Sequence, residues 1–256
     1  MAANGNKCSP QRLTRRDSLQ MDDCAGLGMF GVLEVAIAMG LYYALTDPQW
    51  VLVGKGLSID AKANILILKH CIEAIDSRHR YGSNLQLYYK EWFKSSANQN
   101  FFSWLDYGDG KEVDLEDCPR SKLDQQCVKY LGLEARKSYE HVIVNGKILR
   151  STTRIHLNHE SPQLKYIFVV STSKKLYIGE KKKGFFHHSS FLAGGAILTA
   201  GRLWVKDGVL KRISPSSGHY KPTEDSLERF LSILKENGVN LDEVQIRKAN
   251  EDFWSP

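Results

Sequence analysis

The fold is decided by the stretch His141-Val142-Ile143-Val144-Asn145-Gly146-Lys147-Ile148-Leu149. Two short strand-forming runs flank Asn145-Gly146, a pair that tolerates the positive φ angles of a type I′ turn. The stretch therefore predicts a β-hairpin. The same signature returns where residues 203–205 and 209–213 flank Asp207-Gly208.

Further strands and helices surround these hairpins. Residues 167–170 and 176–178 are apolar runs that predict two more strands of the same, mainly antiparallel sheet. Thr223 is placed to cap a closing helix over residues 224–237, and Gly238 is its expected C-terminal stop.

The part of the chain before the hairpins has helical periodicity. Residues 60–75 and 85–93 each place apolar side chains on one helical face, and Ser83 or Asn84 is the expected N-cap of the second helix. Pro119 is expected to begin a third helix that ends at Gly132. The face of the second helix is formed by Leu85, Tyr88, Tyr89, Trp92 and Phe93.

These patterns together predict an α+β fold, with N-terminal helices, a central mainly antiparallel sheet with hairpins, and a closing C-terminal helix. We divide the chain into an N-terminal extension (residues 1–53), a main domain (54–246) and a tail (247–256). The apolar run from Ala25 to Leu45 contains Glu34, which is costly at the centre of a bilayer. A buried or partner-covered helix is the expected structure there, and association with a membrane is the alternative.

Composition limits the classes of function. The 256 residues carry a formal charge of +6, which is too modest for a protein dedicated to nucleic-acid binding. Five cysteines with no C-x-x-C pair predict reduced thiols of a cytosolic or nuclear protein. Cys118 and Cys127 are expected to be structural thiols, and we assign no metal ligands and no cofactor.

The stretch from Asp106 to Lys111 combines two carboxylates with two glycines. An EF-hand loop that began at Asp106 would need a glutamate at its twelfth position, and Asp117 stands there. The stretch is therefore predicted to be a turn rather than a calcium site.

Two polar clusters flank the glycine-bearing β segment around Gly194, Gly195 and Gly201. Glycines within a strand pattern mark bends or close approach of another backbone, so we expect the two clusters to converge. Their imidazoles and hydroxyls could line a small-ligand pocket or serve a transferase-like or hydrolase-like enzyme. No carboxylate has an assignable role beside them. The candidate pocket residues are His188, Ser189, Ser190, Ser217, His219 and Tyr220.

Several ordered blocks carry a family resemblance. They are Trp104-Leu105-Asp106, Gly108, Gly110-Lys111, Cys118-Pro119-Arg120, Tyr130-Leu131-Gly132, Ile167-Phe168-Val169, Ser171-Thr172-Ser173, Tyr177, Gly179, His188-Ser189-Ser190-Phe191-Leu192 and Ser217-Gly218-His219-Tyr220. Over residues 54–244 the chain resembles the plant calmodulin-binding family whose members carry an IQ motif ahead of a large domain. The resemblance implies a protein of stress responses in the cytoplasm and nucleus, with calmodulin as partner, possible further protein partners and no established enzymatic activity.

The IQ motif itself is incomplete. It is an amphipathic helix whose apolar anchors and basic residues together engage calmodulin. The best candidate is Gln11-Arg12-Leu13-Thr14-Arg15-Arg16, where Pro10 stands in place of the apolar anchor. Calmodulin contact is expected through Gln11, Leu13, Arg15 and Arg16, and a short disordered basic arm is the alternative.

Overall fold

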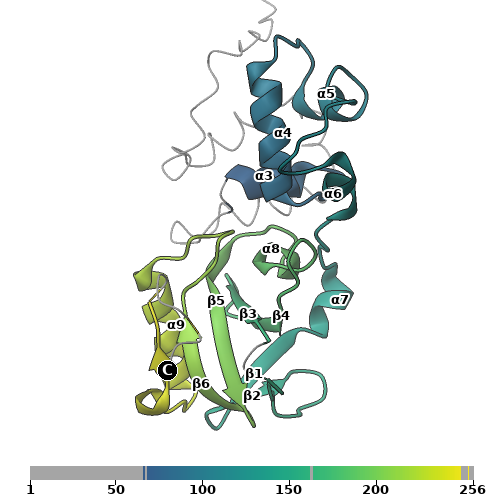
Figure 1. Ribbon diagram of the computed structural model, residues 1–256. Coiled ribbons are helices and arrows are strands. Elements are labelled where there is room, and N and C mark those ends of the chain that lie inside the picture. Colours follow the sequence, from purple (N-terminus) through teal and green to yellow (C-terminus); the bar gives the residue numbers. More distant parts are fainter. Residues whose placement is uncertain (1–65, 67, 162–163, 249–252, 254–256) are drawn as a thin grey trace, which may run out of the picture.

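The computed structural model describes residues 66, 68–161, 164–248 and 253, which form an α+β fold (Figure 1). The helices α3–α6 gather at one end of the molecule, and the sheet occupies the other end with α9 along one side of it. The predicted fold class is confirmed. The division at residues 53 and 246 stays a prediction, and residues 25–45 and the basic stretch 11–16 lie outside the described residues.

The helical end is built around aromatic side chains. It contains α3 (Leu68–Ile75), α4 (Gly82–Lys94), α5 (Phe101–Asp106) and α6 (Arg120–Gln125). Their shared core includes Tyr88, Trp92 and Trp104 together with the thiol-bearing Cys118. In α4 the predicted apolar face is confirmed except at Phe93, which is 46% exposed and lies beyond its edge.

The predicted N-cap of α4 is wrong. Tyr81 holds the N-cap position, with no side-chain cap hydrogen bond. The amide of Gly82 instead donates to the carboxylate of Glu73 at 2.9 Å. An acceptor distant in sequence therefore replaces the local side-chain cap expected at Ser83 or Asn84.

The third predicted helix is shorter than expected. It ends at Gln125, and Gly132 precedes the next helix, α7 (Leu133–Lys137), rather than stopping this one. The intervening backbone bonds to distant segments: Val128 N donates to His79 O at 2.7 Å, and Leu131 N donates to Ser190 O at 2.9 Å. These tertiary hydrogen bonds replace the intrahelical ones.

One sheet contains all seven strands of the described residues, in the order β2-β1-β4-β3-β5-β6-β7. Every neighbouring pair is antiparallel except β6 and β7, which are parallel. The strands are β1 (Glu140–Val144), β2 (Lys147–Arg150), β3 (Tyr166–Ser171), β4 (Leu176–Glu180), β5 (Ile197–Lys206), β6 (Val209–Ser214) and β7 (Gln245–Ile246).

Both predicted hairpins are confirmed. Asn145 and Gly146 have φ angles of 51° and 73°, and Asp207 and Gly208 have 51° and 82°. Positive φ at both central residues is the geometry of a type I′ turn, whose twist matches that of the flanking strands. The turn chemistry thus sets the pairing of β1 with β2 and of β5 with β6.

The two faces of the sheet pack against different elements. On one face, α9 (Glu224–Glu236) contributes Leu227, Phe230 and Leu234 to a core with strand residues such as Phe168. On the other face, Ile167 and Val169 pack in a second core with residues of the short helix α8 (His188–Phe191) and of the helical end. α8 was not predicted, and the predicted cap of α9 at Thr223 is confirmed. A short 3₁₀ helix, η4 (Leu241–Glu243), precedes β7.

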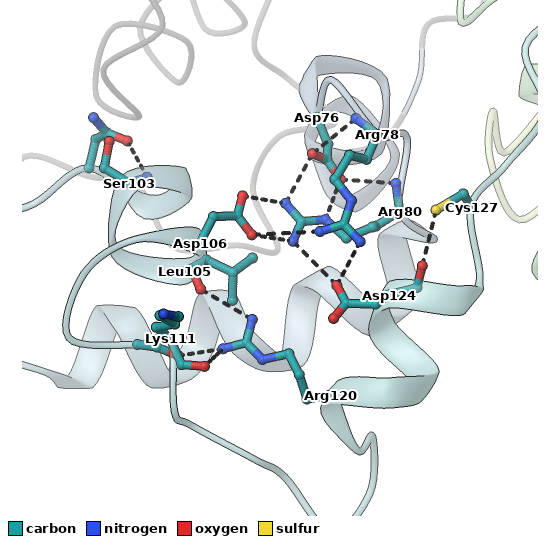
Figure 2. A network of polar contacts seen from close by, with 12 residues as sticks. Asp76, Arg78, Arg80, Ser103, Leu105, Asp106, Lys111, Arg120, Asp124 and Cys127 are labelled. Carbon is teal, nitrogen blue, oxygen red and sulfur yellow. Dashed lines mark hydrogen bonds and ion pairs between the residues drawn. The ribbon is translucent and has the colours of Figure 1, made fainter.

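A polar network fastens the helical end together (Figure 2). Arg80 is fully buried, and its guanidinium donates to Asp76 and to Asp106. Burial alone would lower the pKa of Arg80, but the hydrogen bonds and charges of the two carboxylates outweigh it and raise the pKa. Asp106 is thus engaged in an ion pair, and the stretch that follows it forms the predicted turn.

Within the described ranges, no helix has the length and apolar character needed to cross a membrane.

Candidate functional site

A buried carboxylate lies where the helical end meets the sheet domain. Glu73, near the end of α3, is fully buried. Its Oε1 accepts hydrogen bonds from the hydroxyls of Tyr130 at 3.1 Å and Ser189 at 3.0 Å. Its Oε2 accepts from the amide of Gly82 and lies 3.2 Å from Nδ1 of His70. Glu73 therefore joins α3, the start of α4, the segment before α7 and the helix α8.

Backbone hydrogen bonds bring these segments together. Tyr81 N donates to Gln126 O at 2.8 Å, which fixes the start of α4 against the end of α6. Leu131 N donates to Ser190 O, which fixes the segment containing Tyr130 against α8. The hydroxyls of Tyr130 and Ser189 consequently reach the same carboxylate oxygen.

Histidine rings form a stack beside Glu73. The rings of His70 and His219 are stacked with centroids 3.5 Å apart, and the ring of His187 is stacked on His219 at 4.9 Å. Tyr81 continues the stack, with its centroid 5.0 Å from that of His187. The Nε2 atom of His219 lies 4.0 Å from Oε1 of Glu73.

Burial keeps these imidazoles uncharged near neutral pH. It lowers the pKa of His187 to about 4 and that of His188 to about 3. Burial also lowers the pKa of His70, where the hydrogen bond and charge of Glu73 oppose it without reversing the shift. The pKa of His219 falls well below its usual value because of burial and the neighbouring histidines. Burial, followed by the charge of Glu73, raises the pKa of Tyr130.

Two ring nitrogens in this cluster lack partners. Nε2 of His219 and Nδ1 of His187 are buried and find no hydrogen-bond partner among the described residues. Nε2 of His187, in contrast, accepts from Gly184 N at 2.9 Å. The cluster thus contains polar atoms whose bonding capacity the described protein groups leave unused.

The six candidate pocket residues are all buried. The two blocks that contain them meet: the ring centroids of His188 and His219 are 6.3 Å apart. Each block also contacts a glycine carbonyl: Gly201 O lies 2.9 Å from Nε2 of His188, and Gly195 O accepts from the hydroxyl of Tyr220 at 2.9 Å.

Of these candidates, Ser189 and His219 lie against Glu73, whereas Ser190 and Ser217 have local roles. The hydroxyl of Ser190 accepts from His187 N at 2.9 Å. That of Ser217 accepts from the amides of His219 and Tyr220. The two serines therefore stabilise backbone turns.

The centre of the cluster was not predicted from the sequence. It consists of Glu73, His70, Tyr130 and the adjoining Gly82. The available signal was positional: His70 and Glu73 are three residues apart and occupy the same side of a predicted amphipathic helix. A carboxylate and an imidazole on a buried face require partners, but the periodicity of one helix does not say which.

The arrangement resembles a set of metal ligands more closely than a nucleophile with its base. Ser189 donates to Glu73, and the hydroxyls of Ser190 and Ser217 accept from backbone amides. One nitrogen each from His70 and His219 and one oxygen of Glu73 lie within 4.8 Å of one another.

Comparison with known proteins places the domain. Residues 135–227 match the family model described as the IQ motif-containing protein middle domain. The chain is 60% identical over 202 residues to the IQ domain-containing protein IQM3 of Arabidopsis thaliana, a match that covers 78% of this chain and 44% of that protein. It is 54% identical over 207 residues to IQM2 of the same plant, covering 79% of this chain and 34% of that protein.

The matched region spans less than half the length of these relatives. No solved structure matches the chain. On the extent and identity of the sequence matches, the chain belongs to the plant family of IQ motif-containing (IQM) proteins.

Proposed function

We propose that this protein is a calmodulin-binding regulatory and interaction protein of plant stress signalling, acting in the cytoplasm and nucleus. Its relatives are named as IQ domain-containing proteins, and an IQ helix is a calmodulin-binding element. Calmodulin engages the basic stretch through Gln11, Leu13, Arg15 and Arg16. The domain from α3 to β7 serves as the interaction module.

The observation that carries the non-enzymatic part of this proposal is the internal use of the candidate hydroxyls. Ser189 and Tyr220 donate to Glu73 and Gly195, and Ser190 accepts from the His187 amide. In the serine–histidine arrangement of hydrolases, the nucleophilic hydroxyl donates to a ring nitrogen of histidine. These hydroxyls are instead used to join segments of the fold, which favours an interaction module over a hydrolase or transferase.

Calorimetric titration of the intact chain with calmodulin, in calcium and in chelator, tests the partner. We expect saturable binding in at least one condition. The variants Leu13→Ala and Arg15→Ala/Arg16→Ala should weaken it, because one removes an apolar anchor and the other removes positive charge. Lys7→Ala is the matched control, since it removes a nearby charge outside the stretch. Absence of binding in both conditions would refute the calmodulin part of the proposal.

A further inference from the structure

We propose that His70, Glu73 and His219 form a binding site for a divalent transition-metal ion, with zinc as the ion that their donor atoms suit best. None of these three residues belongs to the basic stretch proposed to bind calmodulin. Two imidazole nitrogens and a carboxylate oxygen form a ligand set that zinc uses in proteins, whereas magnesium and calcium prefer oxygen alone.

The distances are close to those that coordination requires. Nδ1 of His70 lies 3.2 Å from Oε2 of Glu73, and Nε2 of His219 lies 4.0 Å from Oε1. Ligand atoms bound tetrahedrally at ~2.0 Å lie about 3.3 Å apart. Binding therefore requires Nε2 of His219 to move closer to Glu73, and the rings of His70 and His219 to leave their present stack.

Nε2 of His219 gives an independent reason for a ligand. This atom is buried and has no hydrogen-bond partner among the described residues. It lies 4.0 Å from Oε1 of Glu73. A nitrogen that is buried without a partner loses its hydrogen bonds to water, and a bound ligand can replace them. A metal ion would use its lone pair.

Charge balance gives a second reason. Glu73 is fully buried, and within the described ranges its ion-pair contacts are with His70 and His219 alone. Neither contact is with the permanently charged side chain of a lysine or arginine. A buried carboxylate without such a partner is costly, and a divalent cation would balance it.

The surroundings supply the outer contacts that a metal-bound carboxylate needs. Tyr130, Ser189 and the Gly82 amide already donate to the Glu73 oxygens and hold the carboxylate in place. His187, whose Nε2 accepts from Gly184 N at 2.9 Å, stacks on the ring of His219. The ion would join α3 of the helical end to the loop before α9 and thereby stabilise the contact between the two parts of the fold.

The test is titration of the full-length, metal-free chain with Zn²⁺, followed by calorimetry and by thermal unfolding. We expect saturable one-to-one binding and a higher melting temperature, because an ion that binds only the folded state stabilises it. Glu73→Gln and His219→Asn should weaken binding at least 10-fold, since loss of an outer contact alone costs about 10–100-fold.

The matched control is His159→Asn. His159 is also buried and also has an unpartnered Nε2, but it lies on Tyr166 in the sheet domain. Zinc affinity should be unchanged in this variant. Absence of saturable binding by the parent chain, or equal binding by the Glu73→Gln and His219→Asn variants, would overturn the proposal.

A second measurement decides the outcome if those two variants do not fold. The parent chain loaded with Co²⁺ should show the visible absorption bands typical of nitrogen and oxygen ligands. X-ray absorption spectroscopy should indicate two imidazole ligands on the ion. A thiolate-to-metal charge-transfer band, which would place the ion on cysteine, contradicts the proposal, and so does any other imidazole count.

Discussion

Arg80 and Asp106, 26 residues apart in the chain, form a two-point ion pair inside the helical end (Figure 2). Nη1 of Arg80 lies 2.6 Å from Oδ1 of Asp106, and Nη2 lies 2.9 Å from Oδ2. Asp76 binds the other edge of the same guanidinium through Nε at 2.7 Å. A planar fork of donors is needed to satisfy two carboxylates at once, which an ammonium group cannot do.

Arg80→Met should therefore lower the free energy of unfolding by about 3–5 kcal/mol, because two carboxylates lose their buried partner. Arg80→Lys should recover only part of this loss. Urea unfolding at neutral pH measures both. Arg78→Lys is the control: its side chain is 45% exposed, and pairs of this kind contribute about 0–1 kcal/mol. Equal losses of unfolding free energy at Arg80 and Arg78 would show that burial of the Arg80 ion pairs does not determine their contribution.

The shared acceptor Glu73 predicts coupling between two donors. Tyr130→Phe and Ser189→Ala each remove a hydrogen bond to Oε1 and should each cost about 1.5–3 kcal/mol, the range for a charged acceptor. The double variant should differ from the sum of the single losses by at least about 0.5 kcal/mol. Denaturant unfolding of the parent, the two single variants and the double variant measures this coupling as a double-mutant cycle. Ser138→Ala, at an exposed hydroxyl, should change little. Strict additivity would mean that the two hydroxyls act independently.

Gly201 marks a close approach of two strands. A Cβ atom there would lie 2.0 Å from the carbonyl oxygen of Ser214 and 2.8 Å from a ring carbon of Phe168. Gly201→Ala should thus destabilise the domain by about 1–3 kcal/mol or more through overpacking. Gly132→Ala is the matched control, because nothing lies within 4 Å of the Cβ position there. Thermal unfolding compares the two, and similar losses would refute the steric explanation.

Buried neutral histidines in the sheet domain predict a loss of stability in acid. Burial lowers the pKa of His141 to about 4 and that of His159 to about 3, below their ordinary value of 6.5. Between those values the unfolded chain binds more protons than the folded one, so this contribution is complete above pH 6.5 and is lost as the pH falls toward 4.

Each of these histidines steepens the decline by up to about 1.4 kcal/mol per pH unit. His159→Asn keeps an acceptor for the amide of Val205, which Nδ1 now provides at 3.1 Å, and should flatten the pH profile of unfolding in urea. His156→Gln, at an exposed histidine, should leave the profile unchanged. An identical slope in the parent and the His159→Asn variant would contradict the prediction.

Local chemistry was sufficient for the hairpins and the closing helix. Asn145-Gly146 and Asp207-Gly208 adopt the positive φ angles that their hairpin turns require. Thr223 caps the helix that follows it directly in the chain. The same holds for the buried face of α4, because Leu85, Tyr88 and Trp92 are spaced by the helical period. Each of these features depends on residues within a few positions of one another.

Contacts between residues far apart in the sequence determined the remaining features of the fold and the site. The segment after α6 leaves the helix because its amides bond to His79 and Ser190, and α4 begins where Glu73 accepts from Gly82. The two candidate blocks could be named from their residue types, but their common centre could not. Glu73 and Ser189 are 116 residues apart, and only the packing of the helical end on the sheet brings them together. A buried carboxylate specifies that it needs donors, and the tertiary fold selects which ones.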